Sequence, residues 1–215
     1  MFEGHYVEWR INRLKKLVDL LGGEKYIKGL KVLELAAGHG GISAELLKMG
    51  AIPTATDGRV EHVDYMKHHL HGVNILHVDQ RYPYSLGKFD LVIHWGVLYH
   101  LHPDRWMHDL ADAASHAPIL CVETEVCDSE NPECILRVEE QGYDQSLEGV
   151  GTRPSAAAVE KVFGDIGLEF TRYDSKEINS FDTDIFHQYD WAVKNTNTFQ
   201  HGLRRFWMCR HKSWS

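Results

Sequence analysis

The stretch VLELAAGHGG, from Val32 to Gly41, decides the fold of this chain. Its first four residues, among which only Glu34 is polar, form the short apolar run that is typical of a buried parallel strand. Three glycines follow, and residues without a Cβ let a ligand lie against the backbone while the chain reverses direction. An amphipathic helix is expected next, and Gly50 stands where a glycine commonly ends a helix. The stretch therefore predicts a strand, a glycine-rich turn and a helix that hold a nucleoside-containing ligand.

The spacing of the glycines excludes two common nucleotide-binding motifs. Ala36 and Ala37 occupy the place where the dinucleotide fingerprint has its first glycine, and no Lys-Ser/Thr pair follows the glycines as in a P-loop. The pattern E-x-A-x-G-x-G instead resembles the first motif of the class I S-adenosylmethionine-dependent methyltransferases, whose usual form is D/E-x-G-x-G-x-G. Taken alone, the segment also suits an ordinary βα turn of another α/β protein. The resemblance assigns contacts with the cofactor S-adenosylmethionine to Glu34, Ala36, Gly38 and Gly40.

Two further expected strands end in acids. IPTATD ends in Asp57, which follows the first acidic position by about 20 residues, where doubly wound nucleotide folds place a carboxylate for the ribose hydroxyls. Gly58 comes next and gives the turn room. VNILHVD ends in Asp79, and the resemblance to the methyltransferases gives this position a contact with the adenine amino group. We therefore expect Asp57, Gly58 and Asp79 to bind the cofactor.

The stretch FDLVIHWGVLYHL, from Phe89 to Leu101, resembles the fourth strand and the following turn of many family members. Amide and exocyclic-amine methyltransferases usually carry an Asn/Asp-Pro-Pro-Tyr motif after this strand, and cytosine C5 enzymes carry a Pro-Cys nucleophile there. This chain has the residues HWGV at that place, so neither class is favoured. The resemblance counts His94 among the cofactor-binding residues.

The turn after the fourth strand borders the transferring methyl group in this family. Methyl transfer to a hydroxyl requires a base that takes its proton, and histidine is the usual base near neutral pH. His100 is therefore the candidate general base, with Tyr99 shaping the acceptor pocket. A structural histidine packed under a loop is the alternative for His100. No metal is required unless the acceptor is a chelating diol.

We expect a single α/β domain over residues 1–215, with a Rossmann-like, doubly wound sheet of seven mostly parallel strands. After the fourth strand, further strands are expected at 117–126, 168–173 and 203–211. The resemblance implies that the last strand inserts antiparallel between the fifth and the sixth. Helices are expected over 7–21, from Pro103 onward, and from Pro154 to Gly167.

Two long segments, 127–151 and 174–202, do not fit the minimal fold and are expected as loop insertions. Loops of this length are usually functional, so both are candidates to cover the substrate pocket, with ordinary surface excursions as the alternative. The second contains His187 and Trp191 beside a Tyr and an Asp, a set that suits stacking on a sugar face or a small satellite core. Glu123, at the end of the fifth strand, is a further candidate for orienting a substrate hydroxyl, although a salt bridge is the stronger interpretation.

Composition bears on partners and compartment. The formal net charge is −8, with 31 Asp and Glu against 23 Lys and Arg, which disfavours nucleic acid as a partner. The basic cluster of Arg10, Arg13, Lys15 and Lys16 is interpreted as a solvated helix face. No apolar run reaches the ~20 residues that span a bilayer, the N-terminus lacks a signal-peptide h-region, and the four cysteines show no disulfide framework. We therefore expect a cytoplasmic protein with reduced thiols.

The sequence predicts an S-adenosylmethionine-dependent methyltransferase that O-methylates a small molecule or a sugar or glycan precursor. A tRNA wobble-uridine-type methyltransferase is the first alternative, because the GVLYHL stretch also resembles such an enzyme. A non-catalytic, cofactor-binding subunit is the second.

Overall fold

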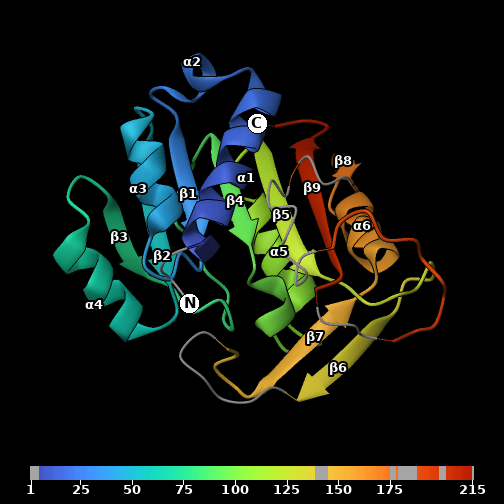
Figure 1. The fold of residues 1–215 in the computed structure, drawn as a ribbon. Helices are drawn as coiled ribbons and strands as arrows, with labels where there is room; N and C mark the ends of the chain where they lie inside the picture. Colours follow the sequence, from blue (N-terminus) through green and yellow to red (C-terminus); the bar gives the residue numbers. More distant parts are fainter. Residues whose placement is uncertain (1–4, 139–144, 175–177, 179–187, 199–201, 215) are drawn as a thin grey trace.

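The computed structural model describes residues 5–138, 145–174, 178, 188–198 and 202–214 (Figure 1). Seven strands form the main sheet in the order β3-β2-β1-β4-β5-β9-β8, and two more form a hairpin. The strands are β1 (Lys31–Leu35), β2 (Ile52–Asp57), β3 (Asn74–His77), β4 (Leu91–Trp95), β5 (Ile119–Glu125), β6 (Cys134–Val138), β7 (Val150–Pro154), β8 (Leu168–Tyr173) and β9 (Arg204–His211). The helices are α1 (His5–Leu21), α2 (Glu24–Ile27), α3 (Gly41–Lys48), α4 (Val60–His69), α5 (Trp106–Ala114) and α6 (Ala156–Asp165), and Leu98–His100 form a 3₁₀ turn, η1.

The sheet has the topology that the sequence predicts. Strands β1 to β5 pair in parallel, whereas β9 lies antiparallel between β5 and β8. Both β4 and β5 are buried along their whole length, as expected for parallel strands covered on both faces. The predicted Rossmann-like sheet of seven mostly parallel strands, with its antiparallel last strand, is confirmed.

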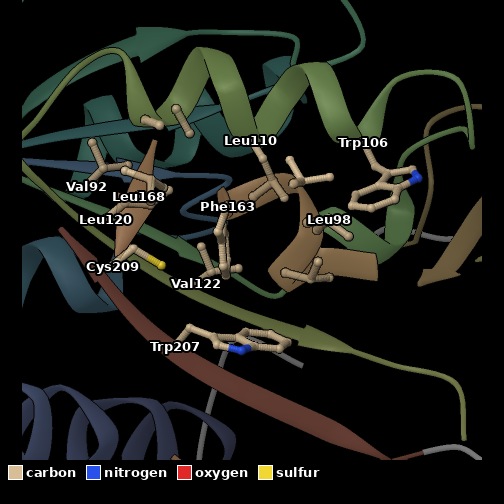
Figure 2. Close-up of a cluster of buried hydrophobic side chains, with 14 of the residues drawn as sticks. Val92, Leu98, Trp106, Leu110, Leu120, Val122, Phe163, Leu168, Trp207 and Cys209 are labelled. Atoms are coloured by element: carbon tan, nitrogen blue, oxygen red, sulfur yellow. The ribbon is translucent and has the colours of Figure 1, made fainter. Parts of the chain in front are cut away.

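Helices cover both faces of the sheet. On one face α1 and α3 pack over β1, β4 and β5, and α4 lies beside β2 and β3 (Figure 1). On the other face α5 and α6 close an apolar core, where Phe163 from α6 lies between Leu110 from α5 and Trp207 from β9 (Figure 2). No helix among the described residues combines the length and the apolar character that crossing a bilayer requires.

The segment 127–151, expected as a loop, contributes instead to a β-hairpin. Strands β6 and β7 pair antiparallel from Cys134 opposite Pro154 to Val138 opposite Val150. Pro154 was expected to open the next helix, but it ends β7. The helix α6 begins two residues later, and Ser155 is its N-cap, with the Ser155 hydroxyl accepting a hydrogen bond of 3.0 Å from the Ala158 amide.

The Ser155 cap gives a first prediction, because this fully buried hydroxyl has several partners. It also donates to the Asn131 carbonyl at 2.5 Å, and thereby ties the hairpin to α6. We expect Ser155→Ala to lower the free energy of unfolding by about 1–3 kcal/mol, since the cap is lost and buried groups lose a partner. Urea denaturation measures the loss. The exposed Ser213→Ala is the matched control, and an equal effect of both substitutions would contradict the capping role.

Candidate active site

A cleft of about 890 Å³, counting its open mouth, lies at the carboxyl ends of the parallel strands. Doubly wound folds bind ligands at this edge of the sheet, where the strand order reverses. The lining residues come from α1, from the turns after β1 to β4, from the end of β5, from the start of β9 and from the segment before β7: Trp9, Arg10, Arg13, Ala36, Gly38, Asp57, Gly58, Arg59, His62, Asp79, Gln80, Arg81, Trp95, Gly96, Val97, His100, Leu101, Glu123, Gln145, Leu147 and Arg204.

The glycine-rich turn after β1 forms one wall. Ala36 and Gly38 both line the cleft and both have positive φ, 50° and 60°. Ala36 thus adopts the left-handed conformation that favours glycine, which explains why glycine is usual at this place of the motif. Gly40 does not line the cleft, and a Cβ on it would lie 2.4 Å from Leu70 Cδ1. The missing side chain of Gly40 therefore serves the packing of α3 against α4.

Glu34 lies behind this wall rather than in it. Its Oε2 accepts hydrogen bonds from the Ser43 amide at 2.9 Å and the Ser43 hydroxyl at 2.6 Å, which fastens the start of α3 to β1. Burial raises the pKa of Glu34 to about 6, although the positive charge of Arg10 opposes the shift. Its Oε1 is buried without a hydrogen-bond partner among the described residues. A cofactor contact of Glu34 stays a prediction.

Asp57 holds the turns of two strands together. Its Oδ2 accepts from the Gly38 amide at 2.8 Å, and its Oδ1 accepts from the Arg59 amide at 2.9 Å and lies 3.1 Å from His62 Nδ1. Asp57 and Gly58 line the cleft, as the sequence predicts for a ribose site. Its location at the end of β2, next to the glycine-rich turn, gives Asp57 access to a ligand on that turn.

Asp79, after β3, also lines the cleft, but Arg81 occupies much of its carboxylate. Arg81 donates to Asp79 through Nε and NH2, at 2.9 and 2.6 Å. Desolvation acts to raise the pKa of Asp79, yet the hydrogen bonds and the charge of Arg81 hold it below its usual range. The neighbouring Gln80 was not predicted. Its side-chain amide donates to the buried Asp109 at 3.2 Å, which fixes Gln80 at the cleft wall.

His94 does not reach the cleft. Successive strand residues point to opposite faces, and His94 points toward α5, away from the face that Trp95 presents to the cleft. Its Nε2 lies 2.6 Å from Asp109 Oδ2, and both side chains are fully buried. The structure therefore places His94 behind the cleft, in contact with the carboxylate that holds Gln80.

His100 lines the cleft, at the end of η1, and its ring centroid lies 4.1 Å from that of Tyr99. Tyr99 itself is not a lining residue. Its hydroxyl accepts from Arg204 at 3.2 Å, and its carbonyl accepts from Arg153 at 2.8 Å. Tyr99 thus supports the cleft floor beneath His100, while the general-base role of His100 stays a prediction.

The cleft floor at the end of β5 carries a group of buried charges, which we call the Arg/Glu cluster: Arg13, Arg153, Arg204, Glu123 and Glu125. Arg204 donates to Glu123 at 2.8 Å, and Arg13 NH1 lies 3.4 Å from the other oxygen of Glu123. Burial acts to raise the pKa of Glu123, but the two guanidiniums together hold it below its usual range. Glu123 therefore forms the salt bridges that the sequence analysis favoured, and it also lines the cleft.

The second long segment, 174–202, reaches the cleft floor through Tyr189, which the sequence analysis considered only as a neighbour of His187 and Trp191. Tyr189 is buried, receives a hydrogen bond from Arg13, and donates to Glu123 at 3.1 Å. Trp191 does not line the cleft, because its ring lies 3.9 Å from the Arg205 guanidinium and packs against the core under α6. His187 lies outside the described residues.

The interpretation of the N-terminal basic cluster was wrong for Arg13. Lys15 and Lys16 are exposed, but Arg13 is 1% exposed and stacks on Trp9 at 3.7 Å. Its place on the apolar face of α1, one residue before the buried Leu14, was the available signal. Among the described residues no three His, Cys, Asp or Glu side chains converge to hold a metal ion.

The segment before β7 covers the end of the cleft near β2 and β3. Gln145 accepts a hydrogen bond of 2.6 Å from Arg59 through its carbonyl, and a Cβ on Gly58 would lie 3.1 Å from Leu147. Figure 1 shows the hairpin beyond the carboxyl ends of the parallel strands. The first insertion therefore encloses the part of the cleft that holds Asp57 and Asp79.

Neither a protein-family model nor a curated protein sequence matches this chain. Solved structures do match it. The N-terminal domain of EvdMO1, in the presence of SAH and D-fucose, has a TM-score of 0.67 and 16% identity, over 97% of this chain and 84% of that one. Magnesium protoporphyrin IX methyltransferase (ChlM) from Synechocystis PCC 6803 with bound SAM has a TM-score of 0.60 and 16% identity, over 98% and 86%.

A third similar structure is the 1,6-didemethyltoxoflavin-N1-methyltransferase of Burkholderia thailandensis, with bound 1,6-didemethyltoxoflavin and S-adenosylhomocysteine. Its TM-score is 0.57 at 19% identity, over 97% of this chain and 81% of that one. At such identities the likeness is one of fold. The chain therefore has the Rossmann-like fold of the S-adenosylmethionine-dependent methyltransferases.

Proposed function

We propose that this protein is an S-adenosylmethionine-dependent methyltransferase that transfers the methyl group to a hydroxyl oxygen of a small molecule, such as a sugar or glycan precursor. The observation that carries the proposal is the cleft at the carboxyl ends of β1 to β5, which joins the glycine-rich turn to Asp57 and to His100. Solved structures with this fold contain S-adenosylmethionine or its demethylated product, and that of the N-terminal domain of EvdMO1 was solved with D-fucose present.

The lining residues suit the cofactor. Asp57 and Asp79 supply acceptors at neighbouring strand ends, which suits ribose hydroxyls and an adenine amino group. Gly96 lines the cleft after β4 and has a φ of 72°, a backbone conformation that favours glycine. When bound, S-adenosylmethionine supplies a methyl group that its sulfonium charge already activates.

The chain's own residues then align the acceptor and accept its proton. His100 would orient an acceptor hydroxyl and take its proton on an imidazole nitrogen as the hydroxyl oxygen receives the methyl group that the cofactor would supply. Trp9, Trp95 and Leu101 form apolar walls that exclude water from this part of the cleft. The products are the methyl ether and S-adenosylhomocysteine.

Asp57 tests the cofactor assignment. We expect S-adenosylhomocysteine to bind with a Kd of about 1 μM, roughly −8 kcal/mol. Asp57→Ala should cost about 1–3 kcal/mol of that, because it removes charged acceptors for the ribose and frees the Gly38 amide. Isothermal titration calorimetry measures both values. Asp64→Ala, at an exposed position of α4, should bind like the parent protein. Absence of binding by the parent protein, or tighter binding of NAD or ATP, would overturn the proposed function.

A further inference from the structure

The cleft is rich in positive charge although the chain is acidic. The net charge of the chain is −8. Among the described lining residues, however, five are arginines and three are carboxylates: Arg10, Arg13, Arg59, Arg81 and Arg204 against Asp57, Asp79 and Glu123. A cleft lined by charge of one sign raises the local concentration of ligands that carry the opposite charge, even when the net charge of the whole protein has the other sign. The lining therefore favours an anion.

The excess of positive charge is concentrated in the Arg/Glu cluster at the end of β5. Its three arginines and two glutamates are each at most 5% exposed. A buried charge without a counter-charge is costly, and the cluster as a whole retains one positive charge beyond its carboxylates. One bound negative charge balances the cluster. A monoanion such as a carboxylate supplies that charge, whereas a phosphate monoester brings ~1.5–2 negative charges near neutral pH and exceeds it.

Two guanidiniums of the cluster have donors to spare. The Nε atoms of Arg13 and Arg204 are buried and have no hydrogen-bond partner among the described residues. Each guanidinium carries five N–H donors, and the contacts with Tyr189, Glu123, Glu125 and Tyr99 use only part of them. Both side chains line the cleft, and the stacking of Arg13 on Trp9 fixes its plane. A planar guanidinium held in this way matches the geometry of a carboxylate.

The position of these donors separates them from the expected place of the cofactor. The glycine-rich turn follows β1, Asp57 is the last residue of β2, and Asp79 follows β3. Glu123 lies near the end of β5, and Arg13 and Arg204 contact it there. Strand β4 lies between β1 and β5, so β5 is about 10 Å from β1 across the sheet. His100 lies after β4, between the two regions. An anion at β5 is therefore on the acceptor side of His100.

Resting on the proposed function, we propose that the acceptor is a hydroxylated carboxylic acid whose carboxylate binds Arg13 and Arg204 while its hydroxyl lies at His100. S-adenosylmethionine itself carries a net charge of +1 at neutral pH, from its sulfonium, ammonium and carboxylate groups. An anionic acceptor therefore also relieves the repulsion between the bound cofactor and the arginines. Hydroxybenzoates and uronic acids have the required combination of groups.

The test is a calorimetric comparison of acids with their neutral counterparts on the protein saturated with S-adenosylhomocysteine. The probes are 4-hydroxybenzoate against 4-hydroxybenzamide and D-glucuronate against D-glucose. We expect at least one acid to bind tenfold or more tightly than its neutral partner. Arg204→Gln should reduce that preference to less than twofold. Arg210→Gln makes the same change at an exposed position of β9 and should keep the preference.

Three outcomes are distinguishable. If S-adenosylhomocysteine fails to bind in the first titration, the proposed function fails. If it binds but neither acid is preferred over its neutral partner, the inference fails alone. If an acid is preferred but displaces S-adenosylhomocysteine, the arginines bind the cofactor's own carboxylate and the inference is overturned. Because the parent protein decides these points, the test stands even if Arg204→Gln does not fold. In that case Arg204→Lys is the variant to test, because it retains the positive charge but lacks the planar guanidinium that binds a carboxylate through two N–H groups. It should weaken binding of the acid and leave binding of its neutral partner unchanged.

Discussion

His100→Gln should lower methyl-transfer turnover by about 10²–10⁴ while leaving the affinity for S-adenosylhomocysteine near that of the parent protein. Glutamine fills a similar space at the cleft wall but cannot take the proton of an acceptor hydroxyl. Transfer of labelled methyl from S-adenosylmethionine to the acids named above, or to an acceptor found by screening hydroxylated metabolites, provides the assay.

The control for this substitution is His108→Gln, which makes the same change at an exposed position of α5. It should leave turnover unaltered. Near-full turnover of His100→Gln would show that His100 is a structural residue packed on Tyr99. The chemistry would then require either another base or a nucleophile that has no proton to lose.

Glu123→Ala should lower the free energy of unfolding by about 3–5 kcal/mol, because it leaves Arg13 and Arg204 buried without their shared carboxylate. Chemical denaturation at neutral pH measures the loss. Glu169→Ala removes a carboxylate from an exposed position of β8 and should change stability by less than about 0.5 kcal/mol. Similar effects of the two substitutions would mean that the cluster does not stabilise the fold.

The pH dependence of stability provides a second readout for Glu123. Its folded-state pKa lies below its ordinary value of 4.5, so the folded protein binds this proton less readily than the unfolded chain does. The stabilisation from ionised Glu123 is therefore fully present above about pH 4.5 and is lost as the pH falls through the lower, folded-state pKa. The Glu123→Ala variant should lack this part of the acid-induced loss. An identical acid profile for both proteins would contradict the lowered pKa.

Local sequence patterns predicted the parts of the fold that local physics determines. The strand, turn and helix around Gly38 and the acids after β2 and β3 are encoded within short stretches, and the structure places Asp57 and Asp79 together at one cleft. The hairpin was missed because its strands are five residues each and pair with one another, so neither carries a long apolar run. His94 illustrates a signal that was present but unused. It is one residue from both Ile93 and Trp95, and successive strand residues point to opposite faces, so His94 lies on the α5 side of the sheet.

The Arg/Glu cluster was beyond the reach of sequence patterns. Its contacts join α1 to the segment before β9, where Arg13 and Tyr189 are 176 positions apart in the sequence. They also join β5 to the start of β9, where Glu123 and Arg204 are 81 positions apart. No periodicity links residues so far apart, and a basic side chain on a helix is normally solvated. Only the three-dimensional arrangement shows that these charges share one buried site.

The insertion of β9 between β5 and β8 has a consequence for how the protein is made. On a ribosome the chain emerges from its N-terminus, so β1 to β5 are available long before β9, which ends at His211. Until then β5 has an open edge, and β8 has no neighbour in the sheet, because it pairs with β9 alone among the described strands. Arg204 is the first residue of β9 and is therefore also made late. A nascent or truncated chain without β9 thus exposes an unpaired sheet edge and lacks Arg204 in the cleft floor, so the cleft is complete only after β9 has been made and has paired with β5.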